Sequence, residues 1–315
     1  MKRKPTMNRP DTHPGVYARL SDLIRLKHKA QGFSFLPRQP VHSLLTGRHA
    51  SRLRGRGLDF EEIRGYLPGD DIRSIDWKVT ARTRKPHTRV YSEERERPVL
   101  LVVDQRLSMF FGTRVNMKSV TAAETAALAA WRVISSGDRV GAVIFNDEEV
   151  RHIRPHRSAR TVMEILNRII EFNHALTVDS RITPSPGALD RALEKTAHLA
   201  RTDTLICIIS DFSGITEDTC RHIKLMGRHN DIILGMIHDP TATDAVNAGT
   251  IVISDGMRQA SLDSSDEDKR NLVREVFNER LHLLTEELTR YGVPVLPIHT
   301  ATGAAEQIRD ALGAR

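Results

Sequence analysis

From residue 98 onward, short apolar runs alternate with segments whose apolar positions recur every three or four residues. Runs such as VLLVV (99–103) and LICII (205–209) are apolar at every position, which is typical of strands buried on both faces of a parallel sheet. Segments such as 117–135 have the apolar spacing of helices. Strands that alternate with helices predict right-handed crossovers. The pattern therefore predicts an α/β fold with a doubly wound, mostly parallel sheet.

The same pattern predicts the order of elements in this part of the chain. The predicted strands are 99–103, 138–147, a hairpin partner at 148–153, 203–210, 231–239 and 292–299. The predicted helices are 117–135, 158–172, 186–200, 216–228, a long amphipathic helix at 267–291 and a closing helix at 302–313. Between the last two strands, residues 249–262 predict a small ribbon.

Ahead of residue 98 the pattern is different. Residues 14–31 have helical apolar spacing, and the first 13 residues are basic and predict a disordered tail. The region up to residue 97 is dense in charge, but it includes apolar residues that must fold against something. We therefore divide the chain into a tail (1–13), an N-terminal segment packing on the sheet (14–97) and an α/β domain (98–315).

Composition is that of a soluble globular protein, with 39% hydrophobic and 28% charged residues in 315. No run of 18 apolar residues occurs, so the sequence predicts no membrane span. Cys207 and Cys220 have no zinc-ligand spacing. They predict buried, reduced thiols, and the expected location is the cytoplasm.

Charge is divided unevenly along the chain. Residues 1–97 hold 22 Lys and Arg against 11 Asp and Glu, whereas residues 98–315 hold 25 against 29. A basic front part can contact nucleic acid, an anionic membrane surface or an acidic protein. Nucleic acid is the least expected of these partners, because no reader motif and no interleaving of aromatic and basic residues accompanies the charge.

Motifs of common catalytic sites are absent from the sequence. There is no GxxxxGK[ST] phosphate loop, no GxGxxG after the first strand of the α/β domain and no GxSxG nucleophile elbow. His152 and His156 are separated by Pro155, so they cannot share a regular helix face as zinc ligands. With no catalytic constellation, we expect a protein that is not an enzyme.

Two carboxylates stand out because each directly follows a strongly apolar strand. Asp104 follows VLLVV, and Asp211 follows LICIIS. If these strands are neighbours, both carboxylates and Ser108 converge at the carboxyl edge of the sheet. Carboxylate and hydroxyl oxygens suit Mg²⁺ or Mn²⁺. The alternative is that each Asp caps a helix or fixes a loop.

The stretch GLDFEEIRGYLPGDDIRSIDWKVTARTRKPHTRVYSEERERPVLLVVD, followed by SMFFG and SSGDRVGAVIF, resembles the DUF58 family of bacterial proteins. The resemblance runs from about Gly55 to beyond Asp211. It implies a von Willebrand factor A-like domain with a Rossmann-like sheet. It also implies a MoxR-type AAA+ ATPase as partner, and this chain is similar to the short soluble form of the family.

The resemblance also implies a metal-ion-dependent adhesion site. Such domains bind a divalent ion through a DxSxS loop, a later threonine and an aspartate after a later strand. Asp104 matches the first Asp, Ser108 the second Ser and Asp211 the later Asp. Two positions depart from the pattern, because Arg106 replaces the first Ser and Gly187 stands where the threonine is expected. Possible substitutes for the threonine are Thr183, Ser185 and Ser213.

Arg106 changes the chemistry expected at this edge. A dication and a guanidinium about 4 Å apart repel by roughly 2 kcal/mol even at the dielectric constant of water. Arginine also supplies a planar set of donors for carboxylates. We therefore expect Arg106 to occupy a degenerate metal site as a built-in counter-ion, with no cofactor. Bound Mg²⁺ or Mn²⁺ is the alternative.

Two further groups are candidates for contacts with other surfaces. Met109, Phe110 and Phe111 directly follow Ser108 in the loop after the strand 99–103. If they face solvent, they form an apolar lip that a partner can contact, together with Ser213 after Asp211. If they face inward, they are core. A second group predicts a salt-bridged, aromatic-anchored brace between the basic segment and the sheet. Its members are Tyr66, Asp70, Asp71, Arg73, Asp76 and Trp77.

Taken together, these features predict a protein-interaction or assembly factor that docks on an AAA+ ATPase through the loops at 104–113 and after Asp211. A competing hypothesis is a divalent-metal-dependent binding protein or hydrolase that uses Asp104 and Asp211. A third is binding of nucleic acid or an anionic surface through residues 1–97.

Overall fold

A computed structural model describes residues 15–31, 58–93, 97–177, 182–185, 187–240, 250–254, 259–263, 291–312 and single residues between 275 and 288. The chain divides into two compact units. One comprises residues 1–37 with 97–315 and is called the sheet domain. The other comprises residues 38–96 and is called the ribbon unit.

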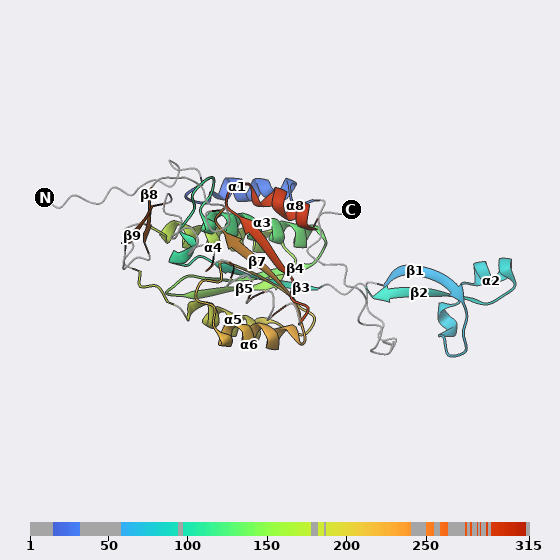
Figure 1. The fold of residues 1–315 in the computed structure, drawn as a ribbon. Helices are drawn as coiled ribbons and strands as arrows, with labels where there is room; N and C mark the ends of the chain where they lie inside the picture. Colours follow the sequence, from blue (N-terminus) through green and yellow to red (C-terminus); the bar gives the residue numbers. More distant parts are fainter. Residues whose placement is uncertain are drawn as a thin grey trace. The chain divides into compact units, whose positions relative to one another are not determined.

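The sheet domain is built on a six-stranded sheet (Figure 1). Five strands are parallel, and the last edge strand is antiparallel to its neighbour. Across the sheet the strands are β10 (Val295–His299), β7 (Asp231–His238), β6 (Leu205–Ser210), β3 (Pro98–Asp104), β4 (Arg139–Phe145) and β5 (Val150–His156). This arrangement is consistent with the predicted doubly wound, Rossmann-like fold of von Willebrand factor A type.

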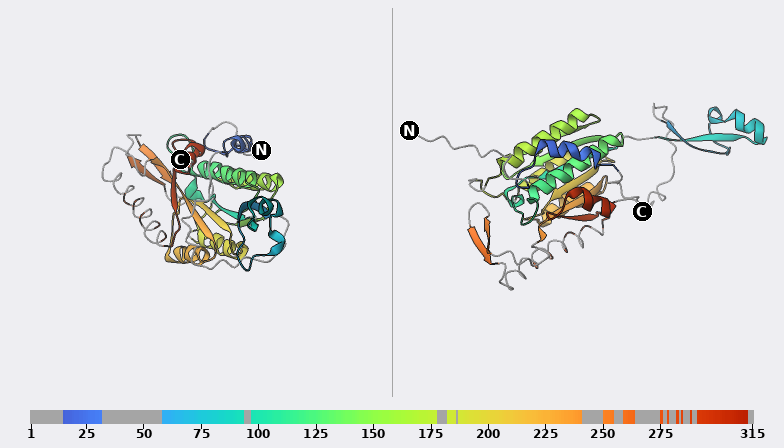
Figure 2. Two further views of the ribbon diagram at one scale, coloured as in Figure 1. Left: turned by 90° about the vertical axis from the view of Figure 1, so that its right-hand side faces the viewer. Right: turned by 90° about the horizontal axis from the view of Figure 1, so that it is seen from above.

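Helices cover both faces of the sheet, as the end-on view in Figure 2 shows. One face carries α1 (Leu20–Arg25), α3 (Lys118–Ser135), α4 (Ala159–Ala175) and α8 (Ala304–Leu312). The other face carries α5 (Ala188–Leu199) and α6 (Glu217–Gly227). Leu284 and Leu288, from the predicted long helix, are buried in this second core and are helical.

The two central strands and α3 show why the sequence folds in this way. Residues 99–104 of β3 and all of β6 are buried, because both faces of each strand are covered. Helix α3 buries six alanines, whose small side chains let the helix lie close to the sheet. At Gly141 in β4, an added Cβ would lie 2.6 Å from the carbonyl oxygen of Ile153 in β5, so only glycine fits that approach.

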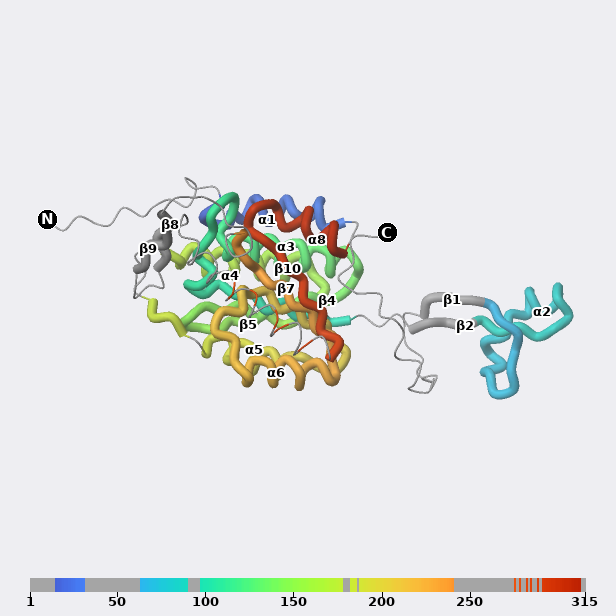
Figure 3. Tube along the Cα trace, viewed as in Figure 1, coloured from blue at the N-terminus to red at the C-terminus, as the bar shows by residue number. Residues whose placement is uncertain are grey.

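Residues 15–31 belong to the sheet domain. Helix α1 is extended by a short 3₁₀ turn, Leu26–His28, and lies beside α3. The indole of Trp131 in α3 donates a hydrogen bond to the Leu23 carbonyl (3.1 Å). In Figure 3 this segment and α8, near the two ends of the chain, lie on the same side of the sheet. The sequence places residues 14–97 in one segment, whereas in the structure residues 15–31 belong with the sheet domain and residues 58–93 belong to the other unit.

The ribbon unit is a two-stranded antiparallel ribbon with a folded connection. Strand β1 (Leu58–Gly65) pairs with β2 (His87–Glu93), and the connection contains a 3₁₀ turn (Ile72–Ser74) and the short helix α2 (Trp77–Thr83). Asp76 begins α2 by accepting hydrogen bonds from the backbone N–H groups of Lys78 and Val79. The sequence predicts that residues 14–97 pack on the sheet, and for the ribbon unit this stays a prediction.

Most of the predicted elements are confirmed within a few residues. The predicted ribbon is observed as β8 (Thr250–Ser254) and β9 (Gln259–Asp263), which pair antiparallel. Cys207 and Cys220 are buried and free of disulfides, as expected. The predicted tail (1–13) lies outside the described residues. No helix in the described part of the chain is long and apolar enough to cross a membrane.

Candidate functional site

The carboxyl edge of the sheet brings the two strand-end carboxylates together. Strands β3 and β6 are parallel neighbours, with Val103 beside Ile209 in register. Asp104 ends β3, and Asp211 directly follows β6. The two strands are therefore neighbours, which is the condition under which the sequence places both carboxylates at one edge.

Arg106 turns back onto Asp104. Its Nη2 lies 2.7 Å from Oδ2 of Asp104, and its Nε lies 3.0 and 3.1 Å from the two carboxylate oxygens. The Arg106 backbone N–H donates to the same carboxylate (2.9 Å), as does the Ser210 hydroxyl (2.6 Å). The pair is deeply buried, with Asp104 0% and Arg106 3% exposed. Arg106 therefore points inward and pairs with Asp104.

Lys118, the first residue of α3, neutralises the second carboxylate. Its Nζ lies 2.6 Å from Oδ2 of Asp211. The other oxygen of Asp211 accepts from the Ser213 backbone N–H (2.9 Å) and, at 3.5 Å, from the Ser108 hydroxyl. Nη2 of Arg106 lies 3.7 Å from this Oδ1. We call Asp104, Arg106, Lys118 and Asp211 the charge cluster.

The loop after β6 is shaped to close the charge cluster. Phe212 is fully buried and has a positive φ of 52°, an uncommon conformation for a bulky residue. Its backbone N–H donates to the Ser210 hydroxyl (2.9 Å), which holds the turn. The turn places the Ser213 carbonyl oxygen 3.1 Å from Nη1 of Arg106. The strained backbone therefore serves the contact with the guanidinium.

Neighbouring charges in the cluster shift the pKa of Arg106 and of Asp211. Burial alone would lower the pKa of Arg106, but the charge and hydrogen bonds of Asp104, with the charges of Asp211 and Asp147, hold the pKa of this guanidinium above its usual value. Burial alone would raise the pKa of Asp211. The charges of Lys118 and Arg106 outweigh that effect, so the pKa of the Asp211 carboxyl lies well below its usual range.

No threonine side chain stands at the position before α5 where the family resemblance implies a metal ligand. Gly187 directly precedes α5 and, as a glycine, has no side chain that could act as a ligand. Thr183 is exposed. The Ser185 backbone N–H donates to Asp147 (2.9 Å), which also accepts from the Leu107 N–H (2.7 Å). Asp147 thus ties the loop before α5 to the loop after β3. Its role is to fix loop positions at the edge of the cluster.

A divalent cation does not fit this arrangement of donors. The oxygens of Asp104 and Asp211 that would ligate it are already in contact with a guanidinium and an ammonium. In the described part of the chain, no group of three or more His, Cys, Asp or Glu is placed to hold a metal ion. Arg106 and Lys118 together carry the two positive charges that Mg²⁺ would bring. We therefore derive no chemistry through a metal.

The predicted apolar lip is partly wrong. Met109 is fully buried in the core under the edge, because the 3₁₀ turn Leu107–Met109 points it toward α3 and the sheet. Phe110 and Phe111 are half-buried. The ring centroid of Phe110 lies 5.7 Å from that of Tyr17, and Nζ of Lys118 lies 6.0 Å from the ring centroid of Phe111. Val115, in the same loop, is 55% exposed.

The predicted brace residues make their contacts inside the ribbon unit. Asp70 pairs with Arg64 (2.9 Å), and Asp76 pairs with Arg89 (2.8 Å). Asp71 accepts from the Arg73 N–H and begins the 3₁₀ turn. Tyr66 is half-buried, and Trp77 is exposed, so the unit does not itself bury the aromatic anchor. A brace to the sheet stays a prediction.

Sequence reasoning missed three members of the site. Lys118 and Ser210 were not distinguishable from ordinary polar residues at a helix start and a strand end. Asp147 is the last residue of the predicted strand 138–147 and so shares the signal that singles out Asp104 and Asp211. That signal, an acid at the end of an apolar strand, could have found it.

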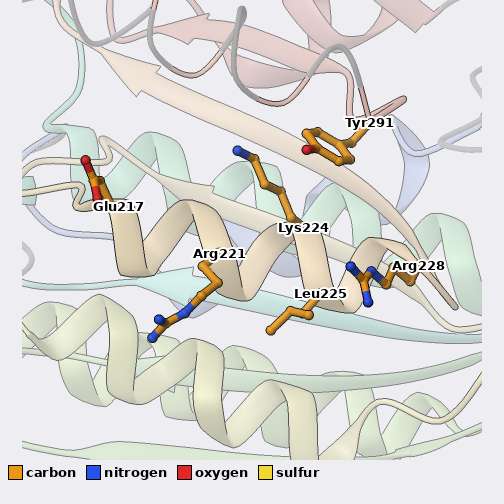
Figure 4. Close-up of a pocket in the computed structure, with 6 residues that line it drawn as sticks. All are labelled: Glu217, Arg221, Lys224, Leu225, Arg228 and Tyr291. Carbon is orange, nitrogen blue, oxygen red and sulfur yellow. The ribbon is translucent and has the colours of Figure 1, made fainter.

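A surface cavity of about 270 Å³ lies elsewhere, along α6 and Tyr291 (Figure 4). Lys224 Nζ lies 5.0 Å from the centroid of the Tyr291 ring, and Arg221 pairs with Asp218 at 3.0 Å. Its other lining residues are Glu217, Leu225 and Arg228. It contains none of the residues singled out from the sequence.

Fold and site together define a class, a doubly wound α/β protein with a neutralised charge cluster at the carboxyl edge of its sheet. The chain belongs to the family described as "Protein of unknown function DUF58", whose model matches residues 62–283. This confirms the resemblance seen in the sequence.

Individual relatives are also similar. Uncharacterized proteins of Mycobacterium tuberculosis and Mycobacterium bovis are 30% identical over 267 residues, covering 84% of this chain and 81% of theirs. The crystal structure of a conserved hypothetical protein, BatB from Bacteroides thetaiotaomicron, matches with a TM-score of 0.41 and 11% identity, over 68% of this chain and 96% of that one. The last likeness is too low to bear on the site.

Proposed function

We propose that this protein is a non-enzymatic interaction or assembly factor that works in the cytoplasm, with a degenerate metal-ion-dependent adhesion site as its docking centre. The supporting observation is the charge cluster, in which Arg106 and Lys118 contact the two strand-end carboxylates. In the A-type domains that the sequence resembles, a bound dication receives a partner. Here two fixed cations hold the same loops in place without a metal.

The docking face is made by the loops around this cluster. Phe110, Phe111 and Ser213 are half-buried, and Val115 is exposed. Apolar residues beside a polar rim are typical of protein contacts. We name these four residues the edge face. Its partner, by family resemblance, is a MoxR-type AAA+ ATPase.

Hydrolysis is the less favoured function, because the carboxylates that a metal-dependent hydrolase would use are neutralised by the protein's own cations. Two-metal phosphoryl chemistry normally also needs more carboxylates than Asp104 and Asp211, the two that this hypothesis uses. An Mg²⁺-dependent activity that disappears in Asp211→Asn would favour the hydrolase instead.

Pull-down of the purified MoxR-type ATPase of the same organism tests the proposal. The tagged chain is compared with a Val115→Glu, Ser213→Glu double variant, which adds two negatively charged side chains to the edge face. We expect binding to fall at least tenfold, because a desolvated charge is costly at a protein interface.

Leu225→Glu on α6 is the control, since it places one such negative charge on an exposed apolar position away from the edge face. It should bind as the native chain does. Circular dichroism checks that all three proteins are folded. Equal binding by the native chain and the double variant would refute the edge face as the docking site.

A further inference from the structure

Exposed apolar side chains gather on one connection of the ribbon unit. Residues 66–86 join β1 to β2 and carry Leu67, Ile72 and Trp77, which are 59%, 64% and 67% exposed. They are three of the most exposed large apolar side chains in the described part of the chain. Each lies on a separate short turn: the turn 67–70, the 3₁₀ turn and the first residue of α2.

The connection lies at one end of the ribbon (Figure 1). Gly65 pairs with His87 at the end nearest the connection, and Leu58 pairs with Glu93 at the other end, where the chain leaves the ribbon. We call residues 66–86 the ribbon tip.

The ribbon tip is also strongly basic. Its acids are used within the unit: Asp70 pairs with Arg64, Asp76 with Arg89, and Asp71 accepts from a backbone N–H. Five exposed cations of the tip take part in none of the ion pairs found among the described residues. These cations are Arg73, Lys78, Arg82, Arg84 and Lys85.

We propose that the ribbon tip docks on an anionic phospholipid surface. Trp77, Leu67 and Ile72 enter the boundary between headgroups and acyl chains, where Trp side chains are favoured. The surrounding Lys and Arg side chains extend to the lipid phosphates, and their long aliphatic stems lie along the apolar layer. This docking goes beyond the function proposed above, because it uses the other unit and none of the edge face.

The chemistry of the tip favours lipid over the other anionic partners. Single-stranded nucleic acid is held by aromatic side chains on which bases stack, whereas two of the three apolar residues here are aliphatic. A protein partner needs a continuous complementary patch of about 800 Å². Three side chains on separate turns can each enter a fluid interface without such complementarity.

Flotation of the full chain with vesicles tests this proposal. Vesicles of phosphatidylcholine with about 30% phosphatidylglycerol are compared with pure phosphatidylcholine at about 0.1 M salt, where charges are screened beyond roughly 10 Å. We expect binding at least tenfold stronger to the anionic vesicles. Both a Leu67→Ser, Ile72→Ser, Trp77→Ser variant and a Lys78→Gln, Arg82→Gln, Lys85→Gln variant should lose at least tenfold.

Leu225→Ser with Tyr291→Ser removes exposed apolar side chains elsewhere, and Arg221→Gln with Arg228→Gln removes cations elsewhere. Both control variants should bind like the native chain. Tryptophan fluorescence of the native chain gives a second measurement of lipid binding. Trp131 is buried, so a blue shift on adding anionic vesicles reports Trp77 and should vanish in Trp77→Phe.

Several results would overturn the proposal. One is no binding to anionic vesicles, and another is equal binding by the native chain and both tip variants, which would assign the lipid contact to other basic residues. Displacement from vesicles by a DNA oligonucleotide at equal charge concentration would indicate a nucleic-acid surface. A lower unfolding temperature of the Ser variant, without vesicles and without loss of lipid binding, would indicate the predicted brace instead.

Discussion

At the residue scale, the charge cluster shows two carboxylates, at positions expected of metal ligands, in contact with cationic side chains of the protein itself. Two carboxylates, Asp104 and Asp211, are each paired with one cation. Arg106 lies within hydrogen-bonding distance of Asp104, and Lys118 lies within hydrogen-bonding distance of Asp211. An uncompensated buried carboxylate would be strongly destabilising, so the cations are required wherever these carboxylates are ionised. The net charge equals that of two carboxylates holding one dication.

This equivalence predicts that removing both cations creates a metal site. In the double variant Arg106→Ser, Lys118→Ser, the two carboxylates lose both cations and keep their backbone N–H donors and small hydroxyl groups, including the hydroxyl of native Ser108. We expect a loss of about 3–5 kcal/mol of stability without metal. Millimolar Mg²⁺ should restore part of it, because a ligand that binds the folded state stabilises it. Thermal unfolding with and without Mg²⁺ measures the effect.

Asp211→Asn in the same double variant is the matched control and should abolish the response to Mg²⁺. The native chain should show no rise in unfolding temperature with Mg²⁺. A rise in the native chain would mean that Arg106 and Lys118 leave the carboxylates when metal arrives, and the metal-dependent hypotheses would then return.

Arg106 could be predicted from the sequence, but Lys118 could not. Arg106 is two residues from Asp104, so local geometry alone limits where its side chain can go. Lys118 lies 93 residues from Asp211, and its contact depends on the position of α3 over the sheet. The same reason explains Met109, whose direction is set by the 3₁₀ turn and the core beneath it.

At the element scale, α3 is the helix that links the core to the site. Its buried face is rich in alanine, and its first residue is Lys118. The small side chains fix the distance between helix and sheet, and that distance places the ammonium on Asp211. Packing of this face and electrostatics of the cluster are therefore coupled.

Ala126→Leu tests that coupling, since Ala126 is fully buried. A larger side chain there must push α3 away or force strained rotamers, at a cost of about 1–3 kcal/mol. Urea denaturation measures the loss. Ser135→Leu adds a leucine at an exposed position of the same helix and should change stability by less than about 0.5 kcal/mol. Equal effects of the two variants would show that the close approach of α3 is not what the alanines provide.

At the scale of the whole molecule, the described core residues lie in the sheet domain. The described residues from 97 onward supply both core clusters, one on each face of the sheet, and residues 15–31 add to one of them. The ribbon unit has its own hydrogen bonds and ion pairs. These observations predict that the sheet domain folds without the ribbon unit.

Replacing residues 38–96 by a Gly/Ser linker of about 20 residues, with a root-mean-square span of roughly 25 Å, tests this. We expect far-ultraviolet circular dichroism typical of an α/β domain and an unfolding temperature within about 4 °C of the native one, a difference of about 1 kcal/mol or less. A chain that fails to fold, or a larger loss, would support the predicted brace.

The sequence by itself determined the α/β alternation, the strand and helix order of the sheet domain and the position of Asp104 and Asp211 at the carboxyl ends of their strands. Each of these follows from local periodicity and from the rule that parallel strands end at one edge. Only the tertiary structure decided which cations reach the carboxylates, that Met109 is core and that Trp77 is exposed within its unit. Those outcomes depend on contacts between residues far apart in the chain, and no local pattern encodes the distance between a helix and the sheet it covers.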